Sequence, residues 1–125
     1  MLEGRDLLTS LCFYDQTLLC VELTTTLLPP GERDWSHYSL DVEAATKEFH
    51  DQVLEQTLGN PSRSRRMPVG DLRSNRSTLA RPLTWIFRWG KVMSFHDSIG
   101  GGTYIRVSYG NRLEQACRAY RSAHE

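Results

Sequence analysis

Residues 83–110 read LTWIFRWGKVMSFHDSIGGGTYIRVSYG, and this segment gives the clearest indication of the fold. Aromatic and β-branched residues alternate with polar ones, which is the period-two pattern of half-buried strands. Gly90 permits a bend, and the glycines at 100–102 favour a turn. The segment therefore predicts an antiparallel hairpin or meander. Trp85 and Trp89 fall on one apolar face of the first strand, so we expect both in the core.

A helix is predicted before this sheet, at residues 39–58. Its apolar positions recur at spacings of three and four, as in an amphipathic helix. They are Val42, Ala45, Phe49 and Val53. Gly59 and Pro61 follow as a stop signal, because glycine accepts the left-handed conformation after a helix and proline cannot continue one. We expect the apolar stripe to pack in the core or at a subunit interface, and the acidic opposite face to avoid polyanions.

The two ends of the chain complete the predicted fold. Residues 5–28 predict a short helix followed by a strand, and residues 111–124 predict a closing helix. Asn111 and Glu114 match a capping box, and Cys117 is interpreted as a small core residue. The fold class is therefore α+β, a small antiparallel sheet with packing helices.

Charge is sorted along the 125-residue chain, although its formal net charge is +0. Residues 1–59 hold three basic and eleven acidic residues, and the rest holds twelve basic and four acidic ones. Within a single predicted domain, 1–125, we distinguish an acidic part (1–59), an Arg-rich arm or loop (60–81), and a sheet with its C-terminal helix (82–125). Such asymmetry indicates a polyanion partner, unless the two parts dock and neutralise each other.

Several function classes find no support in the sequence. No apolar run approaches the roughly 18 residues of a membrane span, and no signal-peptide pattern is present. Cys12, Cys20 and Cys117 show no CxxC spacing, which favours reduced, buried thiols over disulfides or zinc. No Gly-rich phosphate loop followed by a helix and no nucleophile elbow occurs. We therefore expect neither an enzyme nor a bound metal or cofactor, and no membrane partner.

The basic part offers candidate contacts for nucleic acid. Thirteen of the fifteen basic residues in the whole chain are Arg. The planar guanidinium of Arg donates paired hydrogen bonds to phosphate. A sheet face with Arg, Ser and Thr suits duplex RNA, which is recognised mainly through phosphates and 2′-hydroxyls. Trp35, in a polar stretch, could stack on a terminal base pair or pack onto the following helix. The predicted RNA-binding residues are Arg63, Arg65, Arg66, Arg73, Arg76, Arg88, Lys91, Arg106 and Ser108.

Two stretches resemble a known family. Residues 102–122 follow the pattern G-x-x-I-x-V-S-x-G-x-R, then Leu, Cys and Arg-Ser, and residues 89–92 read WGKV. Residues 34–40, DWSHYSL, are similar to the segment S-W-T-E-W-R-L. These motifs resemble the RNA-silencing suppressors of tombusviruses, and the chain's size is similar to the fourteen-kilodalton suppressors of aureusviruses. The resemblance covers about the last third of the chain and one N-terminal patch.

The resemblance implies a plant-virus protein that sequesters small interfering RNA in the host cytoplasm, with the nucleus as a second location. It implies a homodimer whose sheets join edge to edge into a concave RNA-binding surface. Lys91, Arg106 and Ser108 would then contact the RNA backbone, and Trp35 would stack on the duplex end. Tyr38 stands where the family has its second capping tryptophan. We therefore expect binding to duplexes of several lengths.

Two other functions fit the same residues. An Arg-rich interaction protein could use residues 63–66 for nuclear targeting, or Trp89-Gly90 as a WG hook for host Argonaute. A viral movement or capsid accessory protein would instead bind single-stranded RNA.

Overall fold

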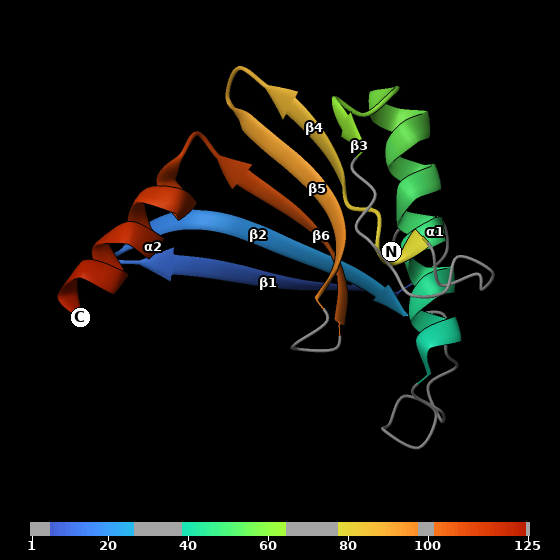
Figure 1. Cartoon of the computed structure of the whole chain (residues 1–125), viewed down its shortest axis with the longest axis horizontal. Helices are drawn as coiled ribbons and strands as arrows, with labels where there is room; N and C mark the ends of the chain where they lie inside the picture. Colours follow the sequence, from blue (N-terminus) through green and yellow to red (C-terminus); the bar gives the residue numbers. More distant parts are fainter. Residues whose placement is uncertain (1–5, 27–38, 65–77, 98–101, 125) are drawn as a thin grey trace.

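The computed structural model describes residues 6–26, 39–64, 78–97 and 102–124. These residues form a six-stranded antiparallel sheet in the order β1-β2-β6-β5-β4-β3, with two helices (Figure 1). Five strands are long, and β3 adds two residues at one edge. The elements are β1 (Asp6–Tyr14), β2 (Thr17–Thr26), α1 (Leu40–Leu58), β3 (Arg63–Ser64), β4 (Leu83–Phe87), β5 (Gly90–Asp97), β6 (Gly102–Tyr109) and α2 (Arg112–Ala123). The α+β prediction is confirmed.

The N-terminal segment forms a β-hairpin: the predicted strand is confirmed as β2, whereas the predicted short helix is wrong, because strand β1 lies there. β1 and β2 pair antiparallel through a two-residue turn at Asp15 and Gln16, whose φ angles are 50° and 65°. Two-residue hairpin turns require positive φ, which Gly and Asn usually supply. Neither residue stands in this turn, so the usual sequence signal is missing. Leucines spaced by three and four residues then give a misleading helical pattern.

Helix α1 has the predicted extent but buries a different face. The Ser39 hydroxyl accepts a hydrogen bond from the Val42 backbone N–H at 3.1 Å and starts the helix. Gly59, with φ 82°, ends it. Of the predicted apolar stripe, Ala45 is exposed, and Val42, Phe49 and Val53 are only half-buried. The buried residues of α1 are Ala44, Thr46, Lys47 and His50.

Lys47 and Asp51 anchor α1 to the sheet through a buried polar cluster. The Lys47 ammonium donates to both carboxylate oxygens of Asp51, at 2.8 and 2.7 Å, and to the Arg81 carbonyl at 2.9 Å. Ser94 of β5 donates to the same carboxylate at 2.6 Å. Burial lowers the pKa of Lys47, and the neighbouring Asp51 carboxylate opposes that shift. The charged pair is thus satisfied inside the protein, as a buried ion pair requires.

His50 lies between α1 and β2 and is fully buried. Its Nε2 accepts a hydrogen bond from the Thr25 backbone N–H at 3.3 Å, and the Thr25 hydroxyl lies 3.0 Å away. Because Nε2 accepts, the proton of the neutral ring belongs on Nδ1, which has no hydrogen-bond partner in the described part of the chain. Burial, together with the charge of Lys47, lowers the pKa of His50 to about 4. The imidazole is therefore neutral at physiological pH.

The apolar core lies between α1 and strands β4, β5 and β6. Its buried members are Leu83, Trp85, Val92 and Ile105, with Leu54 and Leu58 of α1 packed against them. Trp85 also donates from its indole N–H to the Gly59 carbonyl at 2.9 Å. The core placement of Trp85 is confirmed. The core placement of Trp89 is wrong, since it lies beyond the end of β4 in the turn to β5 and is 49% exposed.

Helix α2 lies away from α1, at the opposite side of the molecule (Figure 1). It packs against β2 and β6, yet none of its residues is fully buried. Cys117 is exposed, so its predicted core role is wrong. The predicted capping box is wrong too, because the Asn111 side chain makes no capping hydrogen bond. Glu114 instead binds Lys91 of β5, which ties the helix to the sheet.

Candidate nucleic-acid interface

The two faces of the sheet differ in chemistry. Side chains of β4, β5 and β6 that point toward α1 make the apolar core. The alternating residues of these strands point to the other side. This second surface holds predicted RNA-binding residues, and we call it the basic face. Its defining residues are Arg63, Thr84, Lys91, Met93 and Arg106.

Strand register brings the three cationic side chains of the basic face together. Arg63 lies opposite Thr84, and Thr84 opposite Met93, which in turn lies opposite Arg106. One cross-strand row therefore runs from β3 to β6 with an arginine at each end. Three strand spacings separate the two arginines, about 14 Å. Lys91 lies in the neighbouring row, two residues from Met93 along β5. Residues that are far apart in sequence thus share one surface.

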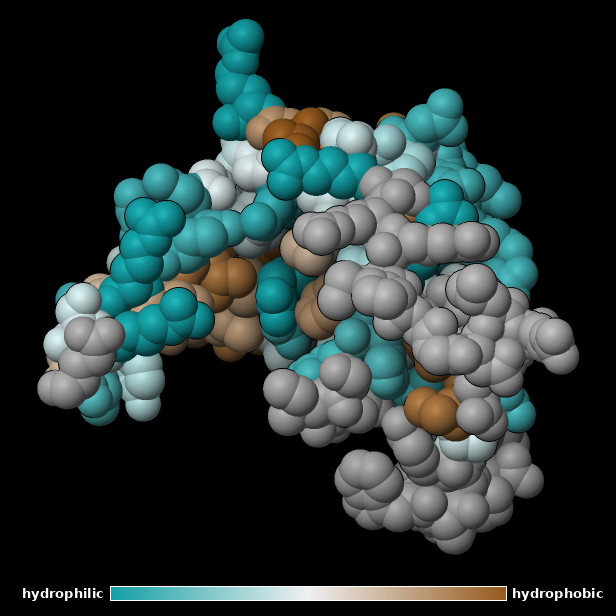
Figure 2. All heavy atoms as spheres, in the orientation of Figure 1, coloured by the Kyte–Doolittle hydropathy of each residue, from teal (hydrophilic) through white to brown (hydrophobic). Residues whose placement is uncertain are grey.

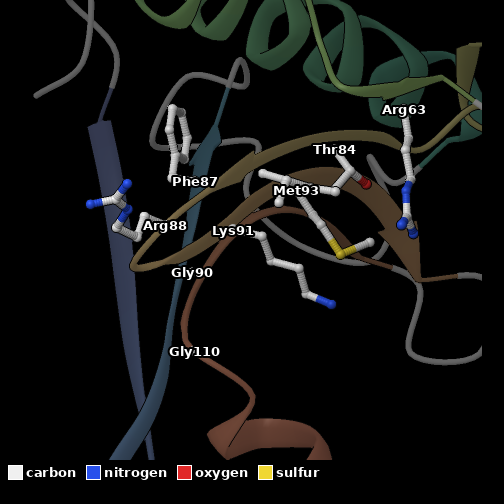
Figure 3. Close-up of a pocket in the computed structure, with 9 residues that line it drawn as sticks. Arg63, Thr84, Phe87, Arg88, Gly90, Lys91, Met93 and Gly110 are labelled. Carbon is white, nitrogen blue, oxygen red and sulfur yellow. The ribbon is translucent and has the colours of Figure 1, made fainter.

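The basic face is hollowed beside the β4–β5 turn. The hollow has a volume of about 450 Å³. Figure 3 shows Arg63, Thr84, Lys91 and Met93 projecting to the same side of the strands, whereas Arg88 projects away from them. Arg88 and Trp89 form the exposed turn between β4 and β5. The lining residues are Arg63, Thr84, Ile86, Phe87, Arg88, Gly90, Lys91, Met93 and Gly110.

Two of the three cations are paired with carboxylates. Lys91 Nζ lies 2.7 Å from Glu114 Oε1, and this hydrogen bond lowers the pKa of Glu114. The Arg106 guanidinium donates two hydrogen bonds, of 2.9 and 2.7 Å, to Glu22 Oε1. All four side chains are only partly exposed. Arg63 forms no ion pair with any carboxylate among the described residues. The face is therefore less positive than the sequence predicts.

Arg106 is held in a fixed orientation by a second contact. Its guanidinium carbon lies 4.6 Å from the centre of the Phe95 ring. Stacking on an aromatic face leaves the guanidinium edge available for hydrogen bonds. Glu22 takes part of that edge. Phe95 and Tyr104 lie beneath as a tilted pair, with ring centres 6.0 Å apart.

Ser108 lies on the same side of the sheet, opposite Lys91 in the β5–β6 register. It is only 1% exposed, and its hydroxyl has no hydrogen-bond partner among the described residues. In this arrangement Ser108 belongs to the floor of the face rather than to its surface.

The remaining predicted contacts lie elsewhere. Arg65, Arg66, Arg73 and Arg76 of the Arg-rich arm, and the two candidate stacking residues Trp35 and Tyr38, lie outside the described residues. An exposed aromatic group, which the core prediction for Trp89 did not anticipate, lies at the β4–β5 turn. There Trp89 stacks on Phe87, with ring centres 5.3 Å apart and an angle of 3° between the ring planes. The ring centre of Tyr109 lies 6.0 Å from that of Trp89.

The acidic partners Glu22 and Glu114 were also missed by sequence reasoning. Glu22 and Arg106 are 84 residues apart, and only the pairing of β2 with β6 brings them together. The alternation of side chains along a strand places Glu22 on the same face as Cys20. It does not indicate which cation lies beside Glu22.

Comparison with protein-family models, curated proteins and solved structures found no match to this chain. Neither described helix is long and apolar enough to cross a membrane.

Proposed function

We propose that this protein binds double-stranded RNA through the basic face, by shape and charge and without reading sequence. The observation that carries the proposal is the gathering of Arg63, Lys91 and Arg106 on one side of the sheet by strand register. Guanidinium and ammonium groups at such spacings suit the regularly spaced phosphates of a duplex. The hydroxyl of Thr84, in the same row, suits the 2′-hydroxyls that distinguish RNA from DNA.

The aromatic residues of this face favour a duplex over a single strand. Single-stranded nucleic acid is held largely by bases stacked on exposed aromatic rings. Here Phe95 is covered by Arg106 and packs against Tyr104, which is itself only partly exposed. Backbone contacts therefore remain as the main source of affinity, and a duplex presents two backbones.

The ion pairs Lys91–Glu114 and Arg106–Glu22 fit this role. Each carboxylate holds a cation in place without RNA and is displaced or shared when a phosphate arrives. Partly exposed pairs contribute little stability, so the exchange costs little. A chain with a net charge of zero can thus present a cationic face to RNA, because the phosphates take the place of the carboxylates.

The biological role in the proposal rests on the resemblance to plant-virus silencing suppressors. We propose that the protein sequesters small interfering RNA in the host cytoplasm, with the nucleus as a second location, and accepts duplexes of several lengths. Catalysis has no part in this role.

We further propose a homodimer joined through β1. This long strand lies at one end of the described sheet. Leu8, Leu11 and Phe13 are 57–60% exposed, and Figure 2 shows hydrophobic side chains over the β1–β2 hairpin. An exposed apolar edge strand is a template for pairing. A second copy of β1 would continue the sheet and its basic face.

A second candidate function is favoured by the exposure of Trp89. A tryptophan followed by glycine in an exposed turn could insert into a pocket of host Argonaute, independently of RNA. Replacing Trp89 by Ala would then abolish Argonaute capture and leave RNA binding intact.

The test of the proposal is titration of a fluorescent RNA duplex with three single variants, Arg63→Ala, Lys91→Ala and Arg106→Ala. Each should weaken binding equally for unrelated sequences and reduce the salt slope of log affinity by roughly 1. Arg121→Ala, an exposed arginine in the last turn of α2, is the matched control and should bind as wild type. Wild-type affinity in all three variants would contradict the proposal.

A further inference from the structure

Three potential metal ligands meet on the β1–β2 hairpin, next to the basic face. Cys12 of β1 lies directly opposite Cys20 of β2, so their side chains share one face of the sheet. Glu22 lies two residues further along β2 and therefore points to the same side. The two sulfur atoms and a carboxylate oxygen all lie within 4.8 Å of one another. Neither thiol is in a disulfide.

This donor set suits a thiophilic divalent cation. Two thiolates and a carboxylate are typical zinc ligands, whereas calcium and magnesium prefer oxygen alone. Zinc–sulfur bonds are about 2.3 Å, so the three atoms must draw slightly closer around an ion. The register shift between Cys12 and Phe13 and the position of β1 at an edge allow that adjustment.

A second observation points to a ligand at the same place. Ser108 of β6 lies opposite Cys20, is fully buried, and has a hydroxyl without a hydrogen-bond partner among the described residues. An unsatisfied buried hydroxyl is costly. A thiolate at Cys20, which a bound cation would stabilise, would supply an acceptor on the residue directly opposite in the adjacent strand. Hydrogen bonds from such neighbours commonly orient metal ligands.

The carboxylate of Glu22 can serve both this cluster and Arg106. Both hydrogen bonds from Arg106 end on Oε1 of Glu22. The second carboxylate oxygen is therefore not needed by the arginine, and a cation can share the carboxylate with it.

We propose that Cys12 Sγ, Cys20 Sγ and the Glu22 carboxylate form a site for one zinc-like divalent cation, with the Ser108 hydroxyl donating to the Cys20 thiolate. Three protein ligands leave a fourth position for water. On binding, each thiol releases its proton to solvent as its sulfur bonds to the metal. The site links the edge strand β1 to β2. The site shares Glu22 with the Arg106 ion pair, but cobalt binding is measured without RNA, so either proposal can fail without the other.

Cobalt(II) is the probe, because thiolate coordination to cobalt gives a near-ultraviolet charge-transfer absorption. The full chain, fully reduced with a non-coordinating phosphine and stripped of metal, is titrated with cobalt and then with zinc. We expect one cobalt per chain with the thiolate band, and its loss as zinc displaces cobalt. Absence of the band in the folded, reduced protein would overturn the proposal.

Variants decide which sulfur atoms bind. Cys12→Ser and Cys20→Ser should lose the band, and Glu22→Gln and Ser108→Ala should weaken cobalt affinity, the latter roughly 10-fold. Cys117→Ser, which removes the exposed cysteine of α2, is the control and should retain the band. Cys12 is only half-buried, so Cys12→Ser tests the site even if Cys20→Ser fails to fold. A band that persists in Cys12→Ser, or disappears in Cys117→Ser, would overturn the assignment.

Discussion

Arg106 on β6 and Glu22 on β2 form an ion pair at one end of the cross-strand row of the basic face, with both hydrogen bonds of the guanidinium ending on one carboxylate oxygen. The pair connects the basic face to the acidic N-terminal part of the chain, to which Glu22 belongs. It lies beside the cysteine cluster, so Glu22 belongs to two proposed sites. Its charge therefore sets how much of Arg106 is available to a phosphate.

Removing the charge of Glu22 should strengthen RNA binding. In Glu22→Gln the guanidinium no longer faces a carboxylate, so a phosphate meets less competition. We expect tighter binding of duplex RNA and a salt slope of log affinity that is steeper by up to about 0.9. Fluorescence anisotropy in the presence of a metal chelator measures this change separately from any bound cation. Unchanged or weaker binding would show that Arg106 does not meet a phosphate.

Loss of the Asp51 carboxylate should destabilise the protein strongly. Asp51→Ala leaves the buried Lys47 ammonium without its counter-ion and Ser94 without its acceptor. Breaking a buried pair in this way costs about 3–5 kcal/mol. Urea denaturation measures the free energy of unfolding. Glu48→Ala, at an exposed acidic position on the same helix, is the control and should change that free energy by less than about 0.5 kcal/mol.

Stability should fall in mild acid because of His50. Its pKa in the folded protein is about 4, below the ordinary value of 6.5, so the unfolded chain binds the proton more readily. The stability that the neutral ring contributes is present above pH 6.5 and is lost as the pH falls toward 4. The loss amounts to about 3 kcal/mol.

Denaturation at several pH values checks this, with His50→Gln expected to flatten the profile over that range. His124→Gln, which replaces an exposed histidine at the end of α2, is the control and should retain it. An equally steep profile in His50→Gln would assign the acid sensitivity to other groups.

Gly90 should tolerate no side chain. A Cβ atom at this position would collide with the Ser108 carbonyl oxygen on the neighbouring strand. Overpacking of this kind costs about 1–3 kcal/mol, so Gly90→Ala should unfold at a lower temperature than wild type. Gly110→Asn is the control, because Gly110 has open space around it and its φ of 56° suits asparagine. A Gly90→Ala protein as stable as the control would contradict the close approach of β5 and β6.

The sequence predicts the elements whose periodicity is strong. Strands at 83–87 and 103–109 and the helices at 40–58 and 112–123 are recognisable because local pattern and tertiary role agree. The hairpin of β1 and β2 is not recognisable from the sequence, because Asp15 and Gln16 occupy turn positions where glycine or asparagine would be the usual signal. The buried face of α1 is not recognisable either, because two of its buried residues, Lys47 and His50, are polar. Their burial is favourable because of partners from elsewhere in the fold: Asp51 and the Arg81 carbonyl bind Lys47, and Thr25 binds His50.

The candidate site was predictable in part. Alternation places Arg106 and Ser108 on one face from sequence alone. That Ser108 is buried, and that Lys91 and Arg106 are paired with Glu114 and Glu22, depends on contacts between elements far apart in the chain. The Cys12–Cys20 cluster required the hairpin register, since the two cysteines are eight positions apart and no local spacing marks a metal site.

The most direct measurement is the affinity of the purified chain for an RNA duplex, a DNA duplex of the same sequence and the single RNA strand, each at two salt concentrations. Recognition of duplex RNA by the basic face predicts the tightest binding to the RNA duplex and a steep loss of that affinity with added salt. Binding of the single strand or of DNA as tightly as the RNA duplex would contradict it.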